Sequence, residues 1–207
     1  MKYLKLVGLA AVVAMAVIGF GGAGSASATV LCKVTESPCS ESNLIKKDGS
    51  LIDADLEGRS VTTLTSGYIF ESCTGGTLAT SVSSPGGASA TVTLATSTTS
   101  WTWSGCEAGG VTVTQSGEIE IHHIAGTDNG TVTAKGFGFK YAGLAGECFY
   151  TPASPGELGL LTGGTTPILD INSVFRESKE SLACIPTIVW KATYKFTQPA
   201  PFYVGAS

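Results

Sequence analysis

The residues of this chain best suited to chemistry lie together in one short stretch, Gly117–Gly126, which reads GEIEIHHIAG. It holds both histidines of the protein, next to each other and directly after two glutamates. Side chains of an extended strand alternate between its two faces, so Glu118, Glu120 and His122 would share one face. Carboxylates and an imidazole are ligands for a divalent metal ion, which makes these three residues the candidate metal site.

The spacing within this stretch favours a simpler interpretation. Neighbouring side chains on one strand face lie roughly 6.5–7 Å apart, which is wide for three ligands of one ion unless the side chains converge. Alternation alone explains the pattern, with Ile119 and Ile121 facing a core and the charged side chains facing water. We therefore prefer a solvated strand face and assign neither a metal nor any other cofactor to the chain.

Catalytic arrangements are matched less well. The Glu118–Ile121 stretch resembles a strand motif of laminarinase-type jelly-roll glycosidases, in which two carboxylates must lie about 5–5.5 Å apart for a retaining mechanism. The third acid of that motif is missing here, because histidines stand in its place. His123 and Asp170 would imitate part of a catalytic triad, but the chain has no G-x-S-x-G motif to supply the serine. We assign no catalytic residues and expect a protein that is not an enzyme.

The N-terminal segment, residues 1–28, predicts an export signal peptide. A basic start is followed by the apolar run Leu6–Phe20, which is shorter than the about 20 residues of a membrane span, and then by the cleavage motif Ala26–Ala28. Cys32 follows Leu31 rather than a small residue, which argues against a lipid anchor. We expect a secreted protein, extracellular or associated with the cell surface, and not held by a membrane after cleavage.

The charge pattern narrows the choice of partners. The chain carries 12 basic and 16 acidic residues, for a net charge of −4, and its only arginines are Arg59 and Arg176. Nucleic acids and anionic membranes are bound by clustered Lys and Arg, which this chain lacks. The sequence does not identify a binding partner, and the class of partner that we expect is extracellular or cell-surface polymers.

The 6 cysteines all follow the predicted signal peptide. An even number of cysteines in an exported chain predicts disulfides, although the sequence alone leaves their connectivity open. The absence of any C-x-x-C spacing argues against a zinc site. Our preferred set of pairs is Cys32–Cys39, Cys73–Cys106 and Cys148–Cys184.

Short alternating runs between Gly, Pro and Asn clusters indicate an antiparallel all-β protein. In Ile188–Phe196 the apolar residues occupy every second position, as in a strand with one buried face. The Asp-Asn-Gly turn in Thr127–Thr131 predicts a hairpin that pairs Glu118–Ala125 with Thr131–Phe139. We expect the Pro- and Gly-rich stretch after this hairpin to be a loop with one short strand near Leu158–Leu161.

These strands predict one disulfide-stapled domain. We expect residues 29–49 to form an N-terminal segment with a local disulfide, and residues 50–207 to form a single antiparallel β-sandwich, Greek-key or jelly-roll-like. Separate strands are expected at Ser50–Glu57 and Val61–Ser66, with breaks at Gly58 and Gly67. The three tryptophans are expected in the core rather than in a sugar-binding platform.

Five segments carry a resemblance to other proteins: Cys73–Thr77, Trp101–Cys106, Glu120–His122, Gly126–Lys135 and Leu169–Asn172. In these segments the chain resembles a group of uncharacterised secreted proteins of actinobacterial type, and the resemblance covers most of the chain after the signal peptide. The group has no known activity. The resemblance therefore implies export and an all-β fold, and it brings no site residues.

The function that we expect follows from these exclusions. It is a non-catalytic structural, adhesive or binding role at the cell surface or outside the cell. One alternative is a carbohydrate-binding or carbohydrate-cleaving jelly roll. A second alternative is a metal-binding protein that uses the face of Glu118, Glu120 and His122. The sequence does not give the ligand or the oligomeric state.

Overall fold

The computed structural model describes residues 28–46, 51–64, 69–87, 91–95, 97, 99–107, 109–143, 146–153 and 156–207. Apart from Ala28, the signal peptide expected over residues 1–28 lies outside the described residues, and so does the break expected at Gly67. Among the described residues, no helix has the length and apolar character needed to cross a membrane.

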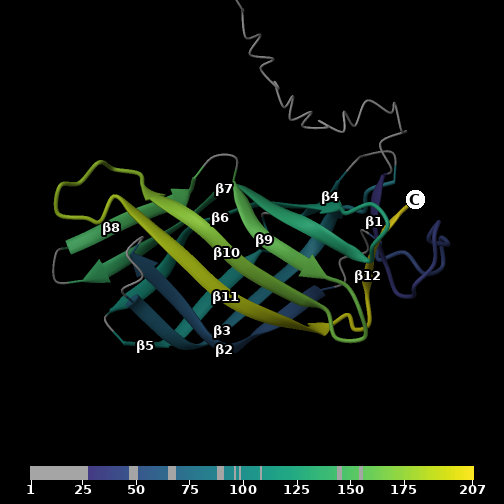
Figure 1. Ribbon diagram of the computed structural model, residues 1–207, viewed down its shortest axis with the longest axis horizontal. Coiled ribbons are helices and arrows are strands. Elements are labelled where there is room, and N and C mark those ends of the chain that lie inside the picture. Colours follow the sequence, from purple (N-terminus) through teal and green to yellow (C-terminus); the bar gives the residue numbers. More distant parts are fainter. Residues whose placement is uncertain are drawn as a thin grey trace, which may run out of the picture.

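The described residues form twelve strands and no helix (Figure 1). One strand pair, β1 with β12, is separate, and the other ten strands make one antiparallel sheet. In chain order the strands are β1 (Thr29–Cys32), β2 (Leu51–Leu64), β3 (Ile69–Ser84), β4 (Val92–Leu94), β5 (Ser100–Cys106), β6 (Gly110–His123), β7 (Asn129–Gly143), β8 (Gly146–Pro152), β9 (Glu157–Thr162), β10 (Ile168–Glu177), β11 (Thr187–Gln198) and β12 (Tyr203–Ala206).

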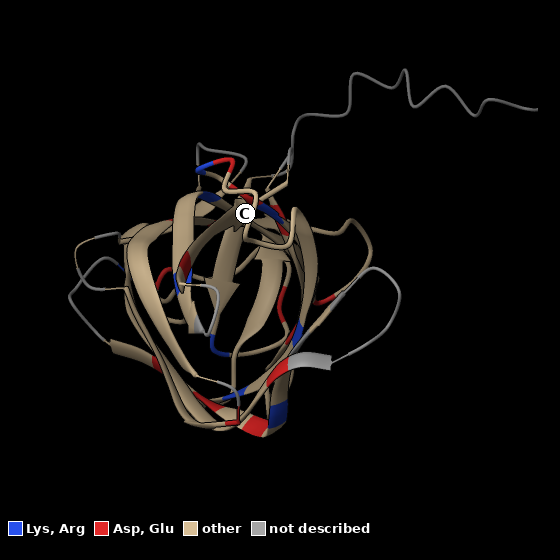
Figure 2. Cartoon of the chain, turned by 90° about the vertical axis from the view of Figure 1, so that its left-hand side faces the viewer, with Lys and Arg blue, Asp and Glu red and all other residues tan. Residues whose placement is uncertain are grey.

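The ten-stranded sheet closes on itself as a barrel with eight strand positions, and the ring is visible end-on in Figure 2. Two positions are each shared by two strands: β4 and β5 follow each other along β3, and β8 and β9 follow each other along β7 and β10. Closure comes from β11, which pairs with β2 and sets Tyr194 opposite Leu56. Paired strands in the rest of the wall are neighbours in the sequence or are separated by one strand, as in β3–β5, β4–β6, β7–β9 and β8–β10.

The barrel corrects the sandwich that the sequence predicted. Alternation of inward and outward side chains is the same in both architectures, so the pattern cannot separate them. The difference is the pairing of β11 with β2, two strands far apart in the sequence. The strands are also longer than expected, because the runs predicted on either side of Gly58 form the single strand β2, which passes this glycine at a positive φ of 78° with a shift of register.

Two local predictions are confirmed. β6 pairs with β7 from Gly110 opposite Ala142 to His123 opposite Gly130, with one shift of register between Val113 and Gln115, and this pair is the predicted Asn-Gly hairpin. Its turn is fixed by Thr127, whose Oγ1 accepts a hydrogen bond from the Asn129 amide at 3.1 Å. The short strand expected inside the Pro- and Gly-rich loop is β9.

Aromatic rings fill the middle of the barrel around Trp190. Its indole ring lies 5.6 Å, centre to centre, from both Trp101 and Trp103, and its Nε1–H group donates a hydrogen bond of 2.8 Å to Ser60 Oγ. Other rings packed against it are Phe137, Phe139 and Phe175. The tryptophans therefore belong to the core and form no exposed platform.

The hydroxyl group of Tyr150 is also shielded from water inside the barrel. Tyr150 is buried beside Phe139, and its hydroxyl donates to the Ile185 carbonyl at 3.1 Å. Burial, together with the nearby charge of Glu177, raises the pKa of Tyr150 to about 12.

The pair β1–β12 caps one end of the barrel, on the right in Figure 1. All four residues of β1 are buried, and Phe202, which precedes β12, packs its ring 5.0 Å from that of Phe196. The cap is tied to the β6–β7 hairpin, because the His123 amide donates to Thr29 Oγ1 and the Val204 amide donates to the Asp128 carbonyl. The start of the N-terminal segment is thus part of the cap at this end of the barrel.

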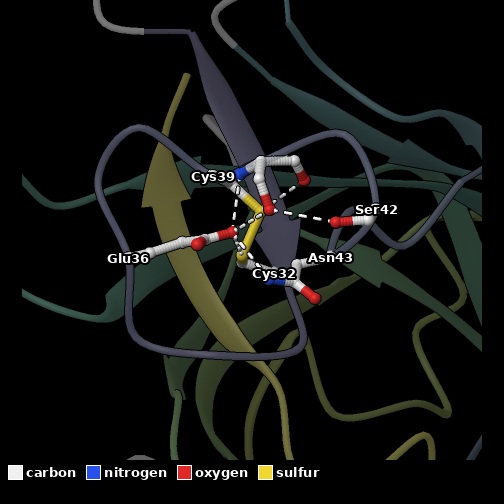
Figure 3. Close-up of a disulfide and its surroundings, with 6 residues drawn as sticks. Cys32, Glu36, Cys39, Ser42 and Asn43 are labelled. Atoms are coloured by element: carbon white, nitrogen blue, oxygen red, sulfur yellow. Dashed lines mark hydrogen bonds between the residues drawn. A yellow bond between two sulfur atoms is a disulfide. The ribbon is translucent and has the colours of Figure 1, made fainter.

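Three disulfides join described parts of the chain, and they are the three pairs of our preferred set. The first, Cys32–Cys39, closes a loop beside the cap, where Glu36 Oε1 accepts hydrogen bonds from Ser40 and Asn43 (Figure 3). The other two join β3 to β5 and β8 to the loop after β10. Each bond restricts the unfolded chain and contributes on the order of a few kcal/mol to stability.

Two neighbouring residues of β10 test which side chains of the wall face the core and which face solvent. Phe175 is fully buried among the rings, whereas Val174 points outward and is 42% exposed. We expect Phe175→Ala to lower the free energy of unfolding by about 3–5 kcal/mol, because it leaves a cavity in the core. The control Val174→Ala should change it by less than about 0.5 kcal/mol. Urea denaturation measures both, and equal effects would contradict the assignment.

Candidate functional site

Strand β6 carries the predicted site residues on the outer wall of the barrel. Ile119 and Ile121 are buried inside, so the alternation predicted for this strand is confirmed. Glu118 is exposed, and Glu120 and His122 are half-buried on the outside. The three candidates therefore share one face, as the spacing predicted.

The carboxylate of Glu120 is already engaged by its neighbours. Lys135 Nζ, on the paired strand β7, lies 2.7 Å from Glu120 Oε1, and this hydrogen bond is the main reason why the pKa of Lys135 is raised. His122 Nε2 lies 3.8 Å from the other oxygen and 3.4 Å from Thr133 Oγ1. The face is thus a cross-strand network of ion pairs and hydrogen bonds, and its lysine supplies the positive charge that a metal ion would bring.

Elsewhere among the described residues, two clusters of potential metal ligands occur, but disulfides block both of them. Two clusters have ligand atoms within 4.8 Å of one another: Cys32, Glu36 and Cys39, and Glu71, Cys73 and Cys106. In both clusters the cysteines are joined as disulfides, so they offer no thiolate to a metal. Glu118, Glu120 and His122 do not form such a cluster.

A shallow depression of about 420 Å³ lies beside this network, between β6 and β7. Glu118 and Lys135 line it together with Gln115, Ser116, Gly117 and Gly136. Only glycine fits at Gly117, where φ is +67° and an added Cβ would lie 2.6 Å from the Phe137 amide nitrogen. Of the three candidate metal ligands, Glu118 lines this depression.

His123 is separated from the other candidates by the alternation of β6. Its Nε2 lies 2.7 Å from the Thr127 carbonyl, in the hairpin turn, and its ring borders a polar cleft of about 300 Å³ that Glu36 and Asp128 also line. Asp170, considered with His123 as a partial triad, lies on β10, which is not a neighbour of β6 in the wall. Its carboxylate accepts a hydrogen bond from Thr193 Oγ1. The structure does not bring these two residues together.

The sequence reasoning overlooked a wide uncharged face on β3, β5 and the first half of β6. No charged residue occurs in residues 74–84, 100–106 or 110–117. Exposed hydroxyl groups cover this face, which we call the hydroxyl wall: Thr74, Thr77, Ser100, Thr102, Ser104, Thr112 and Thr114. Thr77 Oγ1 and Thr102 Oγ1 lie 2.7 Å apart across the paired strands. Ser and Thr at every second position of β5 and β6 were the signal that could have revealed it.

No protein-family model, no curated protein and no solved structure matches this chain. The class of protein is therefore defined by the fold itself: an all-β, disulfide-bonded, closed antiparallel barrel. Its candidate sites are the network around Glu120, the adjoining depression and the hydroxyl wall.

The metal hypothesis leads to a direct test on the purified protein. Because Lys135 already neutralises Glu120, we expect elemental analysis to find no stoichiometric metal and zinc titration to be the same for wild type and His122→Ala. A stoichiometric metal that is lost in His122→Ala, but kept in the control His123→Ala, would contradict this expectation.

Proposed function

We propose that this protein is exported and acts outside the cell as a non-catalytic structural, adhesive or binding protein. Its three disulfides are suited to an oxidising, extracellular environment. The contact surface that we propose is the outer wall of the barrel, and the partners are neutral extracellular or cell-surface polymers.

The observation that carries this proposal is the hydroxyl wall. Hydroxyl groups both donate and accept hydrogen bonds, so a wall of them matches the hydroxyl groups of a neutral polysaccharide. The lack of charge on this wall favours neutral partners over polyanions, whose binding needs clustered basic residues. Neighbouring β2 carries Asp53, Asp55 and Glu57 on its outer side, and these acids would repel an anionic polymer.

The filled interior supports a surface function. Rings occupy the middle of the barrel, and the strand pair β1–β12 covers one end. A barrel that carries a small molecule in its centre needs an open chamber, whereas this interior is packed with side chains. The surface then remains as the place for contact with large partners.

The depression beside Glu118 favours the carbohydrate alternative in its binding form. Gln115, Ser116, Glu118 and Lys135 provide hydrogen-bonding groups around a hollow whose volume falls within the range of small-ligand sites. Cleavage is supported less well, because Lys135 engages Glu120, the second carboxylate of the glycosidase-like pair.

A retention assay tests the proposed contact surface. Wild-type protein should be retained on insoluble neutral polysaccharides, and Thr102→Lys, at the centre of the hydroxyl wall, should weaken retention about tenfold by placing a hydrated charge in the contact. The control is Asn172→Lys, an exposed position on β10, which should leave retention unchanged. Equal loss in both variants, or no retention of the wild type by any neutral polysaccharide, would refute the hydroxyl wall as the contact surface.

A further inference from the structure

One place in the barrel wall lacks backbone pairing. Over their described residues β5 lies against β6, but no backbone hydrogen bonds join the two strands: β5 pairs with β3, and this part of β6 pairs with β7. The gap is covered by partly buried apolar side chains, Trp103 from β5 and Val111 and Val113 from β6. Side chains can move apart here without breaking a backbone hydrogen bond, which makes this seam a point of entry into the barrel.

A small pocket lies directly behind the seam. It is lined by Trp103 and Val111 from the seam and by Phe139, Trp190, Cys73, Ser60 and Glu71 from the surrounding wall. As the side chains stand, the space open to the centre of a water molecule is about 10 Å³, which is enough for about one water. The pocket therefore accepts one small group at a time, with aromatic rings on several sides.

The pocket contains a carboxylate that is almost completely shielded from water. Glu71 is 3% exposed, and its Oε1 accepts hydrogen bonds from the backbone amides of Ser72 at 2.9 Å and Glu107 at 2.8 Å. These amides fix the carboxylate as an acceptor and so hold it in position. Its charge is felt by Tyr141, whose pKa is raised by burial and, in addition, by Glu71.

A carboxylate and several aromatic rings around a small space are groups that can recognise an organic cation. The face of an aromatic ring attracts positive charge, and Trp does so more strongly than Tyr or Phe. None of the residues lining the pocket is basic. An ammonium group is close to water in size, and an alkyl chain attached to it would pass between the apolar side chains of the seam.

We propose that this seam pocket is a binding site for an alkylammonium group, with Glu71 as the counter-charge and the rings of Trp103, Trp190 and Phe139 around the cation. The alkyl chain leaves through the seam between β5 and β6. The site is independent of the proposed surface function, because Glu71 lies inside the barrel and the hydroxyl wall lies outside.

The experiment titrates the full chain with n-butylammonium, with n-butanol as the uncharged probe, and follows tryptophan fluorescence. We expect saturable binding of n-butylammonium that is at least about tenfold tighter than that of n-butanol. Glu71→Gln, which keeps the shape of the side chain but removes its charge, should abolish this preference. The matched control is Glu107→Gln, since that side chain is exposed and pairs with Arg59 outside the barrel.

Each outcome decides the question. No saturable binding by the wild type, or equal binding of the two probes, overturns the proposal, and so does a preference that survives Glu71→Gln. If Glu71→Gln does not fold, the wild-type comparison still decides, together with Trp103→Leu, which removes a ring from the seam. A preference for n-butylammonium that Trp103→Leu leaves unchanged also overturns the proposal.

Discussion

The packing of rings around Trp190 is the interaction on which the rest of this structure depends. The indole ring of β11 meets rings from β5, β7 and β10, and its nitrogen is bonded to Ser60 on β2. One side chain thus connects strands from all around the wall. Among the described residues, these rings fill the middle of the barrel, and the candidate sites lie on the outer wall and in one small pocket behind the seam.

Much of the local structure could be predicted from the sequence. Alternation in Ile188–Phe196 identified the buried face of β11, and Asn-Gly identified the turn between β6 and β7. Both patterns depend on neighbouring residues. Barrel closure depends instead on the pairing of Leu56 with Tyr194, and such a long-range contact has no local signature. The expectation of a sandwich failed for this reason.

The same contrast between local patterns and long-range contacts applies to the candidate sites. The sequence placed Glu118, Glu120 and His122 on one face, and they share one, but it could not show that Lys135 engages Glu120 from the opposite strand. The sequence pattern does not mark Glu71 as a site residue, because a single acid before Ser-Cys is typical of an exposed strand position. Its burial results from the strands and rings that surround it, and these come from distant parts of the chain.

The closed barrel is the central claim, since both the surface function and the seam pocket require it. The most direct measurement is a nuclear Overhauser experiment between β11 and β2 in the folded protein. The closed barrel predicts cross-strand contacts between the backbones of Tyr194 and Leu56, as strong as those between Ala54 and Leu78 within the β2–β3 pair. Strong β2–β3 contacts without any between β11 and β2 would show an open sheet or a sandwich, and would contradict the account.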